Sequence, residues 1–254
     1  MKNGSYHLSR NFNLQDVGDI NWLKKYYNFD AIAFSIDELI VLNVERKKKN
    51  VDFFCKNLIK LNEKCFMPIA AGGGIRSVDD AYKILNSGAD KLIVNTPLLT
   101  QQDLVKSLVE IFGSQCIVAS IDFKKHDDGN IDVLIENGNK STGFSLNDAV
   151  KNAQELGCGE IYLTSMDQDG TGYGYDLENL KKVTDQSKIP IIASGGAGKY
   201  EHFVNGIKKG NASAVSTANL FNFIADGLIE IRKTMIGKGL PIATWDVEFY
   251  KSIQ

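Results

Sequence analysis

Two glycine-rich turns carry the residues best suited to bind a phosphate. Segments 68–76 and 190–198 each run from a short apolar stretch through glycines into a helical pattern. Exposed backbone N–H groups and the positive end of a helix can together hold an anion. Their matching places indicate two phosphate sites and an elongated substrate, although glycines can also serve only to permit a tight turn. The candidates are Gly73, Gly74, Asn95 and Thr96 at one site, and Asp169, Gly170, Gly195, Gly196, Ala218 and Asn219 at the other.

Asp122 is the candidate acid or base, because it ends the nearly continuous apolar run 116–121. A carboxyl group facing a partly desolvated pocket has a raised pKa, which suits proton transfer near neutral pH. The alternative is a carboxylate that is neutralised by Lys124 or that caps a loop. Asp167 and Asp169 follow the next strand. They are equally consistent with binding substrate hydroxyls and with shaping a turn.

Three charged residues stand where strands are expected to begin, at the opposite end from the glycine turns. They are Glu38, Lys91 and Glu160. Charges at this end of a barrel usually contribute stability. A ring of ion pairs there could also gate a passage along the barrel axis.

The elements that must position these residues alternate regularly between strand and helix. Strands are expected near 38–44, 66–71, 91–95, 116–122, 160–165, 189–194 and 213–217. Helices are expected near 19–29, 51–63, 77–87, 101–111, 145–156, 176–186, 199–209 and 224–237. Alternation of this kind predicts βα units around a parallel sheet, here an α/β (β/α)₈ TIM barrel.

The chain also repeats itself at an offset of 122 positions. The offset relates Pro68 to Pro190, Gly88 to Gly210 and Glu38 to Glu160. The repeat predicts one domain over 1–254, with half-barrels at about 1–110 and 111–240 and a tail at 241–254. The strand matching 116–122 would precede Met1, so the first strand is apparently missing or replaced. Either the true start lies upstream, the N-terminal segment substitutes for the strand, or the barrel is open.

Composition narrows the class of protein. The chain has 254 residues, 43% of them hydrophobic, and a net charge of −2, which gives no sign of nucleic-acid or membrane binding. The basic cluster 46–49 is interpreted as a solvated loop. The four cysteines and three histidines show no metal or disulfide spacing, and no targeting segment is evident, so we expect a cytoplasmic protein without a metal or cofactor.

At these residues the sequence resembles the cyclase subunit of imidazole glycerol phosphate synthase, an enzyme of histidine biosynthesis. The resemblance is specific from about residue 66 to 235 and looser before it. The matching segments are Ala71–Arg76, Ser87–Lys91, Val94–Thr96, Phe112–Gln115, Ile121–Lys124, Leu163–Thr171, Gly174–Asp176, Ala193–Gly198 and Glu201–Phe203.

The resemblance implies a heterodimer with a glutaminase, a class I glutamine amidotransferase. Ammonia from the partner would enter between Glu38, Lys91 and Glu160 and cross the barrel. It would react with phosphoribulosyl-formimino-aminoimidazole carboxamide ribonucleotide, giving imidazole glycerol phosphate and aminoimidazole carboxamide ribonucleotide. Asp122 would be one of two acid/base aspartates with Lys124 nearby, and the two glycine turns would bind the two phosphates.

The departures from the family pattern are concentrated in the first quarter of the chain. The second catalytic aspartate and the entrance arginine belong to the missing strand, Asn43 replaces an aspartate, and Asn219 replaces a serine. Three interpretations follow: a histidine-pathway cyclase with a clipped start, a paralogue that forms an acetamidino sugar for surface polysaccharide, or a non-catalytic barrel that docks and activates a glutaminase.

Overall fold

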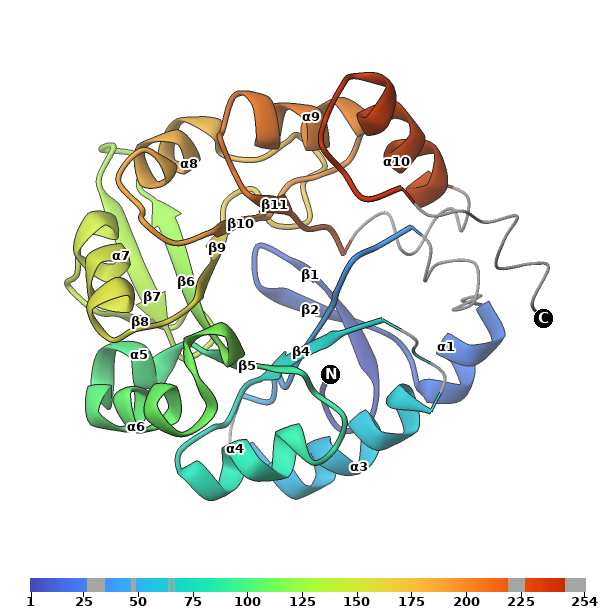
Figure 1. Cartoon of the computed structure of the whole chain (residues 1–254), viewed down its shortest axis with the longest axis vertical. Helices are drawn as coiled ribbons and strands as arrows, with labels where there is room; N and C mark the ends of the chain where they lie inside the picture. The colour runs from blue at the N-terminus through green and yellow to red at the C-terminus, as the bar shows by residue number, and fades with distance from the viewer. Residues whose placement is uncertain (27–34, 47–48, 64, 66, 219–226, 245–254) are drawn as a thin grey trace.

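A curved parallel sheet lies inside a ring of helices (Figure 1). The computed structural model describes residues 1–26, 35–46, 49–63, 65, 67–218 and 227–244. All seven strands predicted for the sheet are present. In sheet order they are β3 (Leu39–Leu42), β4 (Ile69–Gly72), β5 (Lys91–Val94), β6 (Ile117–Lys125), β9 (Glu160–Ser165), β10 (Ile191–Ser194) and β11 (Ala214–Val215).

Each helix matches a predicted range closely, except the short one at Thr96–Thr100, which was not predicted. The helices are α1 (Ile20–Tyr26), α3 (Val51–Asn62), α4 (Val78–Leu85), α5 (Thr96–Thr100), α6 (Gln102–Phe112), α7 (Leu146–Glu155), α8 (Leu177–Thr184), α9 (Tyr200–Lys208) and α10 (Gly227–Gly237). A polar side chain accepts a hydrogen bond from the first turn of four of them: Asn50, Ser77, Ser145 and Asp176. Such caps satisfy N–H groups that have no partner inside the helix and so fix where each helix begins.

The internal duplication is visible in the element bounds. Strand β4 begins at Ile69 and β10 at Ile191, while α4 begins at Val78 and α9 at Tyr200. Both pairs are separated by the same 122 positions that relate the two glycine turns. The strands and helices therefore confirm the predicted (β/α)₈ class with its half-barrel repeat.

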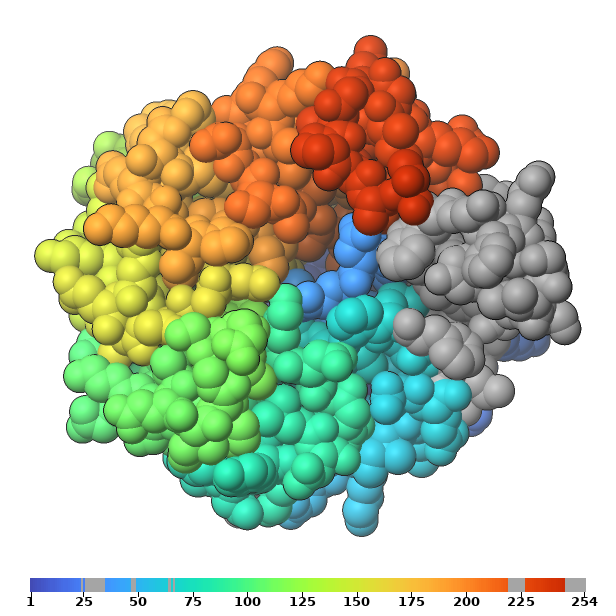
Figure 2. Space-filling view, in the orientation of Figure 1, coloured from blue at the N-terminus to red at the C-terminus, as the bar shows by residue number. Residues whose placement is uncertain are grey.

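The sheet is open between its outer strands in the part of the chain that the structure describes. Strands β3 and β11 end the sheet order and do not pair with each other. The Met1 amino group donates a hydrogen bond to the Leu42 carbonyl, and the Val44 N–H donates to the Met1 carbonyl at 2.9 Å. Met1 therefore lies at the carboxyl end of β3, beside the unpaired edge. In Figure 2, blue atoms of the N-terminal part lie at the middle of the ring, set back from the helices.

Two hairpins add to the barrel. Strands β1 (Tyr6–Arg10) and β2 (Asn13–Gly18) pair in an antiparallel hairpin and form a sheet of their own. The second hairpin was not predicted: β6 continues past the barrel and pairs with β7 (Ile131–Ile135), which pairs with β8 (Lys140–Ser141). The run 131–135 is short and alternates only weakly between apolar and polar residues, so the sequence gives little sign of this strand.

Apolar side chains form two separate cores. The larger one fills the space between the sheet and the helices. The smaller one lies on the other face of the sheet, where Ala70, Ile93 and Val118 pack with Ile40, Leu42 and Tyr162. The inner face of the sheet is therefore only partly filled.

Candidate functional site

One cavity of about 1750 Å³ extends along the inner face of the sheet. Its lining includes Gly73 and Asp122 near the carboxyl ends of the strands and Glu38, Lys91 and Glu160 at their beginnings. In barrels of this class the carboxyl end carries the chemistry. A continuous space thus joins the predicted active site to the charged residues at the other end.

Asp122 lies at the point where β6 leaves the barrel to enter the second hairpin. Its side chain is 8% exposed, and the Asn95 Nδ2 donates a hydrogen bond to its Oδ2 at 3.2 Å. Burial raises the pKa of Asp122 to about 7, with a further rise from the charge of Asp169 and an opposing effect from Lys49. A carboxyl group with this pKa can both give and take a proton near neutral pH.

Lys124, the other predicted catalytic residue, is exposed and does not line the cavity. It lies opposite Asp132 in the β6–β7 hairpin. Lys49 does line the cavity, as Lys91 does at the strand beginnings, so the interpretation of the basic cluster as a solvated loop is wrong for Lys49. Lys49 directly precedes Asn50, the cap of α3, at the rim that follows β3. The sequence signal for a role at the cavity is the position of Lys49 in the loop between a strand and the following helix, and not the charge of its neighbours.

The first predicted phosphate site forms one rim of the cavity. Gly73 and Gly74 have φ values of +94° and +105°, and a Cβ on Gly73 would lie 2.3 Å from the Asn43 carbonyl oxygen. Both the conformation and the close approach require glycine. Asn95 donates to the Ser120 carbonyl at 3.1 Å as well as to Asp122, so its side chain is turned toward β6. Thr96 lines the cavity beside it.

The second predicted phosphate site has the same backbone form. Gly195 and Gly196 have φ values of +92° and +101°, and the Gly174 N–H donates to the Gly196 carbonyl at 2.7 Å. Gly170 and Ala218 also line the cavity. Asn219, which was assigned to this site, lies outside the described residues.

The two aspartates after β9, Asp167 and Asp169, both accept hydrogen bonds from other groups of the protein. The Asp167 carboxylate accepts a hydrogen bond from the Lys125 N–H at 2.7 Å, which favours the turn-shaping alternative. The Asp169 carboxylate accepts bonds from the Ser9 hydroxyl at 2.5 Å and from the Phe12 N–H at 3.1 Å. The tip of the β1–β2 hairpin is therefore fastened to the loop that follows β9, across the carboxyl end of the sheet (Figure 1).

The three charged residues at the strand beginnings come together as a bridged trio. The Lys91 Nζ lies 2.7 Å from Glu38 Oε2 and 2.8 Å from Glu160 Oε1, and each side chain is about a quarter exposed. Burial raises the pKa of Glu38. Burial opposes the charge on Lys91, but its bonds to Glu160 and Glu38 prevail and raise its pKa. The second oxygen of Glu38 is buried without a partner among the described atoms.

No cluster of three or more metal-ligating side chains occurs among the described residues. Within those residues, no helix is long and apolar enough to cross a bilayer.

Comparisons with known proteins agree on one family. The family model described as "Histidine biosynthesis protein" matches residues 10–224. The chain is 43% identical over 225 residues to the putative imidazole glycerol phosphate synthase subunit hisF2 of Parasynechococcus marenigrum, covering 89% of this chain and 83% of that protein. It is 39% identical over 244 residues to the imidazole glycerol phosphate synthase subunit HisF of Streptococcus mutans and 38% identical to that of Streptococcus sanguinis, with 95% of every chain covered.

Proposed function

The chain belongs to the histidine biosynthesis protein family, and from this membership we propose that it is the cyclase subunit of imidazole glycerol phosphate synthase. The observation that supports the proposal best is the position of Asp122. This carboxyl group is buried at the cavity between two glycine turns of the same form, and its pKa lies at about 7. The reaction is that of a lyase, using ammonia and a substrate with two phosphates.

We propose that Asp122 transfers protons at the reacting carbon. Ammonia adds to the ketone carbon of phosphoribulosyl-formimino-aminoimidazole carboxamide ribonucleotide, and the acid form of Asp122 gives a proton to the carbonyl oxygen. Loss of water leaves an imine. Cleavage of a carbon–nitrogen bond then releases aminoimidazole carboxamide ribonucleotide, and ring closure gives imidazole glycerol phosphate. A pKa of about 7 suits both directions of proton transfer.

The two glycine turns are proposed to hold the two phosphates of this substrate. Gly73 and Gly74 begin one site and Gly195 and Gly196 the other, and all four line the cavity that contains Asp122. Positive φ values turn these backbone segments so that their N–H groups can face an anion. A substrate bound at both turns would span the cavity mouth.

A glutaminase subunit is the proposed source of ammonia. The bridged trio of Glu38, Lys91 and Glu160 stands at the beginnings of the strands and lines the same cavity as Asp122. Ammonia released there by a partner could reach Asp122 without leaving the protein. The relatives from both Streptococcus species are named as subunits, which supports a partner for this chain.

The test is turnover of the two-phosphate substrate with ammonium salt at alkaline pH, where free ammonia is plentiful. We expect activity in the chain alone and a loss of at least about 100-fold in Asp122→Asn, the typical contribution of an acid/base group. Asp128→Asn is the matched control, because Asp128 is exposed in the β6–β7 hairpin. A chain that folds but never turns this substrate over would refute the cyclase proposal and leave the sugar-amidinating or docking interpretations.

A further inference from the structure

Lys49 has an unused donor beside the first glycine turn. Its Nζ donates to the Asn43 carbonyl at 2.9 Å and lies 3.4 Å from the Asn137 Oδ1. A lysine ammonium has three N–H donors. Among the described atoms, only these two acceptors are found for it, and the side chain lines the cavity.

Lys49 and the glycine turn share their neighbours. The Asn43 carbonyl that accepts from Lys49 is also the group that leaves no room for a Cβ on Gly73, at 2.3 Å. A Cβ on Gly74 would lie 3.0 Å from the Lys49 Cβ. The lysine stem therefore packs directly against the turn whose N–H groups are proposed to bind phosphate.

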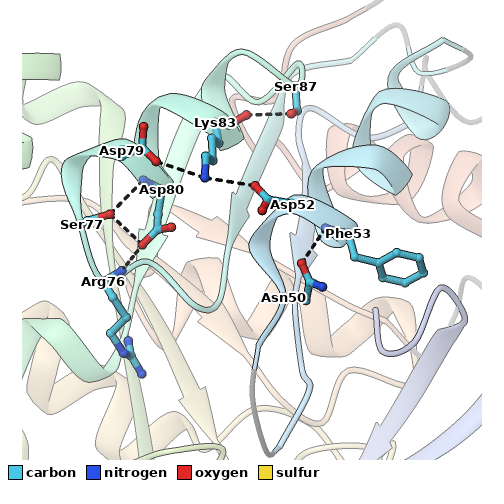
Figure 3. A network of polar contacts seen from close by, with 9 residues as sticks. All are labelled: Asn50, Asp52, Phe53, Arg76, Ser77, Asp79, Asp80, Lys83 and Ser87. Carbon is cyan, nitrogen blue, oxygen red and sulfur yellow. Dashed lines mark hydrogen bonds and ion pairs between the residues drawn. The ribbon is translucent and has the colours of Figure 1, made fainter.

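A second cation, Arg76, follows the same turn and also lines the cavity. Its backbone N–H donates to the Asp80 carboxylate at 2.9 Å, and Asp80 also accepts from Ser77, the cap of α4. Figure 3 shows the Arg76 side chain leaving this cap on the side away from Lys83.

The loops that carry the two cations are tied together behind the site. Lys83 lies 3.1 Å from Asp52 of α3 and 3.1 Å from Asp79 of α4, so one ammonium joins the first turns of both helices (Figure 3). Asn50 and Ser77 cap those helices directly after Lys49 and Arg76. Lys49 and Arg76 each directly precede the cap of a helix. Because Lys83 joins the first turns of these two helices, it also fixes the positions of Lys49 and Arg76 relative to each other.

We propose that Lys49 is a substrate-binding residue which, with Arg76, gives the Gly73–Gly74 turn the positive charge needed to bind a phosphate group. This inference rests on the proposed function, which places one phosphate of the substrate at this turn. Hydrogen bonds from a charged donor to an anion are roughly twice as strong as neutral ones. The first site would then bind its phosphate through side-chain charge as well as through backbone N–H groups.

The electrostatics of Lys49 favour an incoming anion. Burial, and secondarily the charge of Arg76, lowers the pKa of Lys49 to about 8, while Asp122 and Glu45 act in the opposite direction. A phosphate placed between two cations would reduce their mutual repulsion and replace part of the water that Lys49 has lost. Lys124 is exposed and lies outside the cavity, so a phosphate bound there would not replace lost water around it or reduce its repulsion from another cation.

The test is a calorimetric titration of the whole chain with inorganic phosphate in the millimolar range. Because either turn can take this probe, the parent is expected to show two sites. Lys49→Met should weaken one of them at least about tenfold, the size expected for one charged hydrogen bond, while Lys49→Arg should keep it within about threefold. Lys60→Met is the matched control, since Lys60 is exposed on α3.

Phosphate binding by Lys49→Met that equals binding by Lys60→Met overturns the proposal, and so does equal loss in Lys49→Met and Lys49→Arg. A parent chain that binds no phosphate overturns it as well. Thermal unfolding of each variant shows that the fold is intact. Turnover separates the two proposals: an inactive parent with the expected phosphate pattern refutes only the cyclase assignment. An active parent whose phosphate binding ignores Lys49 refutes only the role of Lys49.

Discussion

Replacing Asp122 by asparagine should stabilise the protein relative to the parent, and this advantage should be larger at pH 8 than at pH 5. The parent carboxyl group has its pKa raised from 3.8 to about 7 by burial, the charge of Asp169 adding to the effect. Above the folded-state pKa the group must be ionised in an environment that disfavours its charge. Asparagine has nearly the same shape, stays neutral, and its oxygen can still accept the bond from Asn95 Nδ2.

The sign follows from proton binding. Between pH 3.8 and about 7 the folded chain holds a proton that the unfolded chain has released, so the parent loses stability as the pH rises through this window. One pKa unit corresponds to about 1.4 kcal/mol, so the full cost is about 4 kcal/mol, of which about 3 kcal/mol appears between pH 5 and pH 8. Asp122 is 8% exposed, so solvent screening reduces this little.

Urea denaturation at pH 5 and pH 8 measures the effect, with Asp128→Asn as the exposed control. We expect the advantage of Asp122→Asn over the parent to grow by about 3 kcal/mol between the two pH values. The control should follow the parent at both. An advantage of Asp122→Asn that is the same at both pH values, or that shrinks toward pH 8, would refute the raised pKa and with it the physical basis for proton transfer by this residue.

Two further changes test the strand beginnings and the second glycine turn. Lys91→Met should cost about 2 kcal/mol of unfolding free energy in urea, because it leaves Glu38 and Glu160 half-buried and close together without their shared cation. Gly196→Ala should cost several kcal/mol, since its φ is +101° and a Cβ would lie 2.0 Å from the Gly174 carbonyl oxygen. Gly129→Ala, at φ +84° with no atom within 4 Å, should cost only about 1 kcal/mol.

Comparing the variants with one another identifies the cause of each loss of stability. Equal losses in Gly196→Ala and Gly129→Ala would mean that backbone strain alone, and not the close approach at the second turn, requires glycine at Gly196. The trio is checked by adding Glu160→Gln to Lys91→Met. The double variant should recover part of the lost stability because one unpaired carboxylate is removed, and a further loss would contradict the ion-pair account.

Local sequence signals were sufficient for most of the architecture. Buried strands such as β4 and β6 are runs of apolar residues, and helices such as α3 and α4 begin directly after a side chain that caps them. Because these signals depend on neighbouring residues in the chain, they predict elements without knowledge of the fold. The repeat at 122 positions then orders them, and the carboxyl ends of parallel strands necessarily share one edge of the sheet.

Site residues, too, can be recognised in the sequence when their neighbours in the chain carry the signal. Glycines at strand ends and Asp122 after an apolar run are recognisable because backbone freedom and burial leave a trace in adjacent residues. Lys49 is harder to recognise, since it is one of several adjacent basic residues and only its position just before the cap of α3 sets it apart. Its approach to the cavity depends on the course of the loop after β3 and on acceptors as distant as Asn137.

The sequence by itself determined the parallel α/β barrel, its duplication, the two glycine turns and the buried acid at the end of β6. Only the tertiary structure decided that Lys124 is exposed while Lys49 lines the cavity, and that Asp169 holds the β1–β2 hairpin through Ser9 and Phe12. The difference has a physical reason. Secondary structure and burial follow from periodicity along the chain. The partner of a charged or hydrogen-bonding side chain depends instead on segments brought together by folding, which for Ser9 and Asp169 are 160 positions apart.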